Sequence, residues 1–187
     1  MSNKKFPRIY SLSTVGIRNH YNSDYRFHPF RTDFAGDSGV GKSIIADVLQ
    51  LILVGEREFK SATDSSSERE ARKLIIERYG YVFLNIAIDT DKFIVIGMYI
   101  STTSIDPFII QANIGLDVFE PLSSPLISKD FMLGDEIIDI TNLPERMKEN
   151  KQAYAAKLSL NKYHELLEQN KILPIDLKTE GNLKNFA

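Results

Sequence analysis

Cysteine is absent from the 187-residue sequence, and no apolar run approaches the roughly 20 residues that a membrane-spanning helix needs. Without cysteine the chain can form neither disulfides nor thiolate metal sites, which suits a reducing compartment. Histidine is scarce, and His20, His28 and His164 show no metal-ligand spacing, so we interpret them as ordinary surface or half-buried residues. The residues after Met1 are polar and form no signal segment. We therefore expect a soluble, cytoplasmic protein without membrane contact.

Neither sign of charge dominates the composition. The chain carries 23 Lys and Arg against 25 Asp and Glu, for a net charge of −2. This balance gives no general indication of nucleic-acid binding, although a local basic face would leave the total unchanged. The length is sufficient for one domain with a hydrophobic core. Composition alone does not name a function, and the motifs have to supply it.

One stretch carries a chemical signature. Residues 36–43 fit the spacing G-x-x-x-x-G-K-[ST] of a phosphate-binding loop. Its glycines allow the backbone N–H groups to approach a phosphate closely and to form an anion nest. Lys42 is expected to reach the β- and γ-phosphate oxygens, and the Ser43 hydroxyl to ligate Mg²⁺. The predicted nucleotide-binding residues are Gly36, Asp37, Ser38, Gly39, Val40, Gly41, Lys42, Ser43 and Ile44.

The neighbours of this loop support that interpretation. Thr32–Ala35 precedes it as a short predicted strand, and Lys42–Leu53 follows as a predicted helix, closed by Gly55. Apolar residues recur in the helix with the spacing of a core-facing surface. The N-terminal partial positive charge of the helix would face the phosphates. A glycine-rich turn without a ligand is the alternative, and we expect a nucleoside triphosphate site.

Strand patterns on both sides of the loop and helix predict antiparallel hairpins. Arg8–Ile17 and Tyr25–Phe34 are predicted to pair around a turn at Asn19–Asp24. Tyr79–Asp89 and Phe93–Ser101 form a second predicted hairpin, because two β-branched and aromatic runs flank a short polar turn. The sequence therefore predicts a mixed α/β fold, in which an antiparallel hairpin layer lies against a sheet that carries the phosphate loop, with flanking helices.

The second half of the chain predicts further helices. One begins at Leu143, where Asn142 is the expected N-cap and Glu145 completes a capping-box pair. Another is expected over Tyr163–Leu173. For both helices we expect packing or solvated faces rather than a site.

Two other features have competing interpretations. Lys60, Ser61 and Thr63 belong either to a plain surface loop or to a segment close to the nucleotide. Asp89 follows an apolar strand, as a Walker B aspartate does, but its neighbours are turn residues and no glutamate follows it. We therefore interpret Asp89 as a turn residue.

Gln111 stands in the predicted strand Pro107–Ile114. A glutamine at a strand end is either a capped polar side chain or, in nucleotide-binding proteins, a Mg²⁺ ligand that positions the attacking water. The residue pattern leaves both interpretations open.

These residues together resemble the N-terminal half of an ATPase head of the SMC (structural maintenance of chromosomes) superfamily, and most of all its MukB and Wadjet-type bacterial branch. The similarity is strongest in Asp33–Gly55, where a strand, the loop and a helix follow the family pattern. It continues in Phe59–Ser67 and in Tyr81–Ile114, and more weakly in Tyr163–Ala187. The resemblance covers nearly the whole chain.

The resemblance implies a P-loop NTPase fold of the ABC/SMC head type, with ATP and Mg²⁺ as cofactors. Residues 1–187 would form the N-terminal lobe of a head, with 1–115 as the nucleotide-binding core and 116–187 as a peripheral segment leading towards a coiled coil. Gln111 corresponds to the Q-loop glutamine of the family, which implies that it ligates Mg²⁺ beside Ser43. Lys42 and Gln111 are then the expected catalytic residues.

The sequence departs from the family pattern in two respects. It contains neither the Walker B aspartate–glutamate pair nor a Ser-Gly-Gly signature, which normally lie in the C-terminal half of the head. We therefore expect the chain to be part of a longer polypeptide, or its other half to be a separate chain. The implied partners are that C-terminal half, a second head in a homodimer, DNA bound by the assembled complex, and accessory subunits.

The implied function is ATP-driven head engagement that acts on DNA, in chromosome organisation or in defence against plasmids and phage. A self-contained small P-loop kinase or nucleotide switch is the alternative, although the chain shows few of the clustered arginines expected of a kinase lid. A scaffold that binds ATP without hydrolysing it is a third hypothesis.

Overall fold

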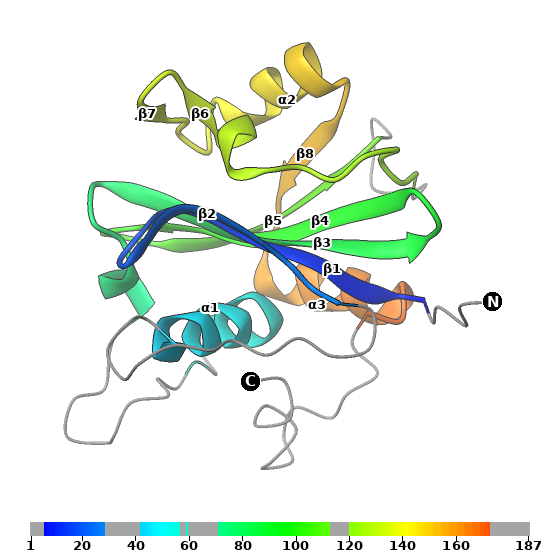
Figure 1. Cartoon of the computed structure of the whole chain (residues 1–187), viewed down its shortest axis with the longest axis horizontal. Helices are drawn as coiled ribbons and strands as arrows, with labels where there is room; N and C mark the ends of the chain where they lie inside the picture. Colours follow the sequence, from blue (N-terminus) through cyan, green and yellow to red (C-terminus); the bar gives the residue numbers. More distant parts are fainter. Residues whose placement is uncertain (1–5, 29–41, 57–58, 60–70, 113–119, 173–187) are drawn as a thin grey trace.

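The computed structural model describes residues 6–28, 42–56, 59, 71–112 and 120–172 (Figure 1). For Lys42 and Ser43 the description covers the backbone and not the side chains. The elements are β1 (Arg8–Ile17), β2 (His20–Arg26), α1 (Lys42–Val54), η2 (Ala71–Leu74), β3 (Tyr79–Asp89), β4 (Lys92–Ser101), β5 (Ile105–Gln111), η3 (Ser128–Phe131), β6 (Met132–Leu133), β7 (Glu136–Ile137), α2 (Leu143–Lys151), β8 (Tyr154–Lys157) and α3 (Leu160–Gln169). None of the helices in these ranges is long and apolar enough to cross a membrane.

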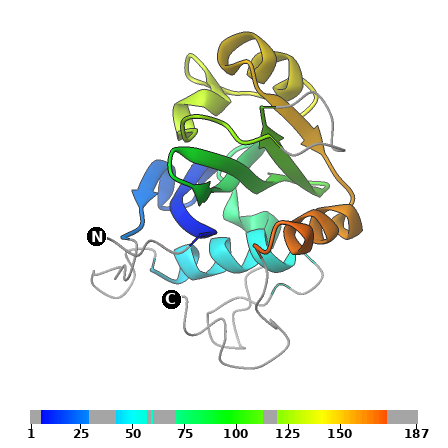
Figure 2. The same cartoon turned by 90° about the vertical axis from the view of Figure 1, so that its right-hand side faces the viewer.

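A six-stranded sheet with the order β2-β1-β3-β4-β5-β8 forms the middle layer. All of its neighbouring strands run antiparallel. Figures 1 and 2 show α1 and α3 on one side of this sheet and α2 with the β6–β7 hairpin on the other. We call the side of α1 the helical face and the opposite side the aromatic face.

Alternation along the central strands gives each face its own hydrophobic core, because successive side chains of a strand point to opposite sides. On β3, Val82, Leu84 and Ile86 belong to the cluster that contains α1 and α3, whereas Tyr81 and Phe83 belong to the other cluster. Both faces of the sheet are therefore covered, which explains why its central strands read as nearly continuous apolar runs.

The aromatic face holds the segment between β5 and α2 in place. The Phe131 ring stacks on Phe83 with centroids 4.4 Å apart and lies 4.8 Å from the Tyr81 ring. Fully buried Asn85 donates through Nδ2 to the Leu126 carbonyl oxygen (2.7 Å) and accepts the Leu126 N–H (2.9 Å). These hydrogen bonds satisfy the buried amide and fix the register of an otherwise irregular stretch of chain.

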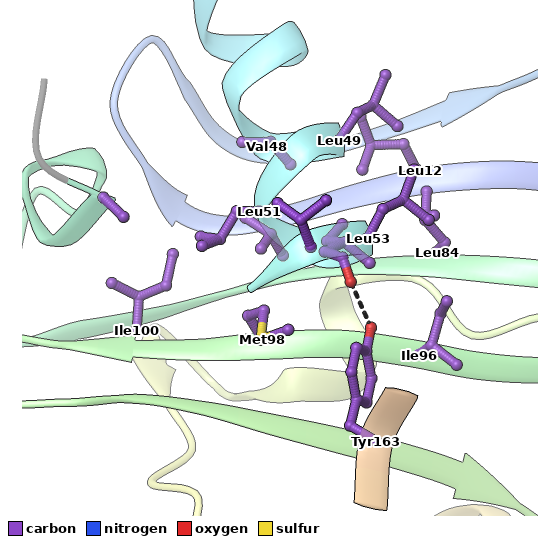
Figure 3. Packing of buried hydrophobic residues seen from close by; sticks show 14 of the residues in the cluster. Leu12, Val48, Leu49, Leu51, Leu53, Leu84, Ile96, Met98, Ile100 and Tyr163 are labelled. Carbon is purple, nitrogen blue, oxygen red and sulfur yellow. Dashed lines mark hydrogen bonds between the residues drawn. The ribbon is translucent and has the colours of Figure 1, made fainter. Parts of the chain in front are cut away.

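On the helical face, α1 is buried almost all round. Its isoleucine, leucine and valine residues from Ile44 to Val54 are at most 6% exposed, which is expected of a helix that is hydrophobic on nearly all sides. The helix packs against β3 and β4, and Figure 3 shows Leu51 and Leu53 among Leu84 and Met98. Each fully buried side chain of this kind contributes roughly 1.5–3 kcal/mol, so packing rather than helix propensity holds α1 in place.

The C-terminal end of α1 is fixed by two contacts. Gly55 takes the left-handed conformation (φ +82°) and donates its N–H to the Leu51 carbonyl oxygen at 2.9 Å, so it ends the helix as predicted. The Tyr163 hydroxyl of α3 donates to the Ile52 carbonyl oxygen at 2.6 Å (Figure 3). Burial raises the pKa of Tyr163 well above its ordinary value, so the hydroxyl keeps the proton that this contact needs.

The structure confirms the predicted mixed α/β fold with an antiparallel layer. The first and third strands have the predicted boundaries, and the helix over Lys42–Leu53 ends one residue later. The expected strand Thr32–Ala35 lies outside the described residues. An antiparallel sheet is not typical of a P-loop NTPase.

The first hairpin forms, but the predicted position of its turn was wrong. The structure pairs Ile17 with His20, so the turn is Arg18–Asn19 and the returning strand is β2. Asn22 and Asp24, predicted as turn residues, lie in β2, an edge strand on which polar side chains are ordinary. His20, expected to be a surface or half-buried residue, is 8% exposed, and its ring shares a hydrogen bond with the Tyr25 hydroxyl.

The helix ends were predicted less well than the helices. α2 begins at Leu143 as predicted, but the Asn142 side chain makes no capping bond because its backbone is already helical (φ −97°, ψ −11°). α3 begins at Leu160, three residues earlier than predicted, because the Ser159 Oγ caps it by accepting the Lys162 N–H at 3.2 Å.

Removing the Tyr163 hydroxyl should destabilise the fold. We expect Tyr163→Phe to lower the free energy of unfolding by about 1–3 kcal/mol, because the buried Ile52 carbonyl loses its hydroxyl donor. Tyr21→Phe is the matched control, since Tyr21 is 37% exposed and its hydroxyl bonds Glu77 at the surface. Urea unfolding of both variants measures the difference, and equal losses would contradict the role given to the α1–α3 contact.

A comparison of alanine substitutions at Gly55 and at Gly134 separates the cost of backbone strain from the cost of tight packing at the end of α1. Gly55 and Gly134 both have positive φ (+82° and +64°), so alanine should cost about 1–2 kcal/mol at either position. At Gly55 the added Cβ would also lie 2.5 Å from Leu160 Cδ1, whereas at Gly134 it would meet nothing within 4 Å. We expect Gly55→Ala to lower the melting temperature more than Gly134→Ala. The opposite order would show that α1 does not end as described.

Candidate functional site

The candidate site lies at the start of α1. Residues 36–41 of the phosphate-loop motif, Gly36, Asp37, Ser38, Gly39, Val40 and Gly41, lie outside the described residues. The structure describes the motif from Lys42 onward, as the backbone of the first turn of α1. The first four N–H groups of a helix have no partner within it, and they carry a partial positive charge suited to an anion.

Ile44 anchors this first turn to the sheet. It is 1% exposed and belongs to the core of the helical face, together with Leu12 of β1. A side chain in that position packs the helix rather than touching a ligand, so the predicted contribution of Ile44 to the nucleotide would come from its backbone N–H. With Gly55 and Tyr163 at the other end, α1 is fixed along its whole length.

Gln111 ends β5 and is fully buried. Along β5, Ile105 and Ile109 pack in the core of the helical face, while Phe108 and Ile110 pack in the aromatic core. The alternation of a strand therefore places Gln111 on the same face of the sheet as α1. Its backbone partner in the sheet is Tyr154 of β8, so β8 holds the strand end at which the glutamine stands.

Asp47 is a candidate residue of the site at the start of α1 that was not predicted from the sequence. It is 1% exposed although it is an acid, and it stands four residues after Ser43, on the same side of α1. A buried carboxylate must be paired or hydrogen-bonded, and Asp47 makes the second turn of α1 more polar than its apolar neighbours suggest. The sequence signal that could have revealed Asp47 is an acidic residue within the apolar run IIADVLQLIL.

Of two other predicted features, one is placed in a turn and the other lies outside the described residues. Asp89 is exposed in the β3–β4 turn, where its Oδ1 accepts the Thr90 N–H at 2.7 Å, as expected of a turn residue. Lys60, Ser61 and Thr63 lie outside the described residues.

A shallow pocket of about 220 Å³ opens at the opposite end of α1. Glu56, Met98 and Leu160 contribute to its lining, and Glu56 comes directly after the glycine that ends the helix. This pocket is therefore not the space next to Lys42. Within the described ranges, no group of three or more His, Asp or Glu side chains is placed to hold a metal ion.

No family model matches the chain, and neither does any curated protein sequence. Any assignment therefore depends on the motif, on the helix that it begins and on the face that this helix shares with Gln111.

Proposed function

We propose that the chain binds ATP–Mg²⁺ through residues 36–44 and forms the N-terminal part of an ATPase head of SMC type. The observation that carries the proposal is that α1 begins at Lys42, the lysine of the motif, and is then buried against the sheet. A loop with this spacing, followed directly by a fixed helix, is the arrangement that phosphate-binding loops require.

Each residue has a distinct part in the proposed site. The loop N–H groups and the start of α1 would hold the β-phosphate, and the Lys42 ammonium would neutralise charge on the β- and γ-phosphates. The Ser43 hydroxyl would ligate Mg²⁺. Gln111, on the face that carries α1, would complete the Mg²⁺ shell and orient the attacking water.

Hydrolysis needs groups that this chain does not supply. Phosphoryl transfer is accelerated chiefly by positioning and by stabilising charge, and the Walker B pair and the signature serine would have to come from a C-terminal half and a second head. In the proposed function two heads enclose two nucleotides, hydrolysis separates them, and the complex acts on DNA. Its biological setting would be chromosome organisation or defence against plasmids and phage.

Lys42→Ala should abolish most ATP binding. It removes the cation aimed at the β- and γ-phosphates, and loss of such a charge-assisted contact costs about 1.5–3 kcal/mol, or more than tenfold in affinity. Lys92→Ala is the matched control, because Lys92 is an exposed lysine at the β3–β4 turn. Calorimetric titration with ATP–Mg²⁺ measures both variants, and equal affinity in Lys42→Ala and wild type would refute the site.

Catalytic turnover should separate this chain from the completed head. Residues 1–187 alone should bind ATP–Mg²⁺ weakly and hydrolyse almost none of it. In a protein with both halves, Gln111→Ala should slow hydrolysis more than it weakens binding, and Gln111→Met, which keeps the bulk and removes the amide, should do the same. Phosphate release and ATP affinity are the two readouts. Rapid turnover by residues 1–187, independent of protein concentration and lost in Lys42→Ala, would show that the catalytic groups are misplaced.

A further inference from the structure

Two arginines lie near the ring of one tyrosine at the end of the sheet where β1 begins and β2 ends. The Arg26 guanidinium carbon lies 4.7 Å from the centre of the Tyr10 ring, and that of Arg8 lies 5.7 Å from it. Tyr10 in turn packs edge-on against Phe93, with centroids 4.9 Å apart. We call Arg8, Tyr10 and Arg26 the arginine–tyrosine cluster.

The cluster lies on the aromatic face of the sheet, opposite α1. Arg26 pairs with Ser11, whose Oγ accepts from Asn85 Nδ2, the same amide that bonds Leu126. Arg8 pairs with Ala87, two residues along β3 from Asn85 and therefore on the same face. The cluster is thus separate from the first turn of α1, which lies on the helical face.

A β-bulge brings the three side chains together. The β1–β3 register runs from Ile9 opposite Ile86 directly to Ser11 opposite Asn85, so Tyr10 is the extra residue. Arg8 and Tyr10 are two residues apart and share the aromatic side of β1 by ordinary alternation. The extra residue places Ser11, the partner of Arg26, on that side as well. Bulges commonly re-aim side chains in this way next to functional sites.

The positive charge of the cluster is not neutralised within the part of the chain that the structure describes. Arg8 Nε and Nη1 are buried there without a hydrogen-bond acceptor, and neither guanidinium has a carboxylate within ion-pair distance. The nearest acid along β2 is Asp24, whose two oxygens already accept from Ser13 and Ser128. A guanidinium that is partly removed from water without an acceptor is costly unless an anion compensates it.

We propose that the arginine–tyrosine cluster is a binding site for a phosphate group, on the opposite side of the sheet from α1. Guanidinium forks bind phosphate and carboxylate oxygens in pairs, but a planar carboxylate fills one fork, whereas a tetrahedral phosphate offers oxygens to two. Half-buried Arg8 is held by the sheet, and exposed Arg26 leaves the site open to solvent. The phosphate could belong to a small nucleotide or to a polynucleotide backbone, and the experiment distinguishes these sources.

The test uses the full chain carrying Lys42→Ala, so that it does not depend on the phosphate loop. Inorganic pyrophosphate and ATP are titrated calorimetrically, and a fluorescent single-stranded oligonucleotide is titrated by anisotropy at several salt concentrations. We expect the double variant Arg8→Gln, Arg26→Gln to weaken binding at least tenfold. Arg78→Gln, which removes an exposed arginine at the opposite end of β3, is the matched control and should change nothing.

The pattern among probes identifies the source of the phosphate. Binding of pyrophosphate and ATP without tighter binding of the oligonucleotide assigns a small nucleotide. Tight oligonucleotide binding, with a log–log salt slope that falls by about 1–2 in the double variant, assigns a polynucleotide. Because Arg26 is exposed on an edge strand, Arg26→Gln alone should keep the melting temperature and still lose affinity. The proposal is overturned if no probe binds, or if affinity is unchanged in the arginine variants.

Discussion

Burial of α1 against the helical face is the constraint on which the rest of the structure depends. The helix has almost no polar side, so it is stable only where the sheet and α3 remove it from water. The same packing holds the first residue of the helix, Lys42, in position against the sheet. The Tyr163 hydroxyl and Gly55 fix the other end of the helix. A phosphate-binding helix has to be held in this way, because the proposed chemistry consists mainly of placing donors accurately.

The sheet provides that support by being covered on both faces. Its helical face packs aliphatic side chains against α1 and α3, and its aromatic face packs rings against the segment that leads to α2. Alternation along β5 then assigns Gln111 to the side of α1, and the register of β1 assigns Arg8 and Arg26 to the other side. Two anion-binding functions on opposite faces of one sheet would follow from this arrangement.

The sequence allowed the central elements to be predicted because their signals are local. Tyr79–Asp89 and the helix that starts at Lys42 have strong apolar patterns, and their boundaries hold almost to the residue. β2 was misplaced because an edge strand is as polar as a turn, and β8 was missed because four residues paired to β5 carry no pattern of their own. The arginine–tyrosine cluster depends on a bulge and on pairing between distant strands, which spacing along the chain does not reveal. The motif at residues 36–43 was identifiable because glycine, lysine and serine have separate chemical roles at fixed spacing.

The central claim is that a nucleotide binds at the start of α1. Amide hydrogen exchange followed by mass spectrometry, with and without saturating ATP–Mg²⁺, tests it most directly because it locates the protected amides along the chain. The account predicts that exchange slows in peptides covering residues 36–44, where backbone N–H groups would hold the phosphates, and that AMP, which lacks the β- and γ-phosphates, gives little protection. Unchanged exchange in those peptides at saturating ATP, or protection confined to residues 8–26, would contradict it.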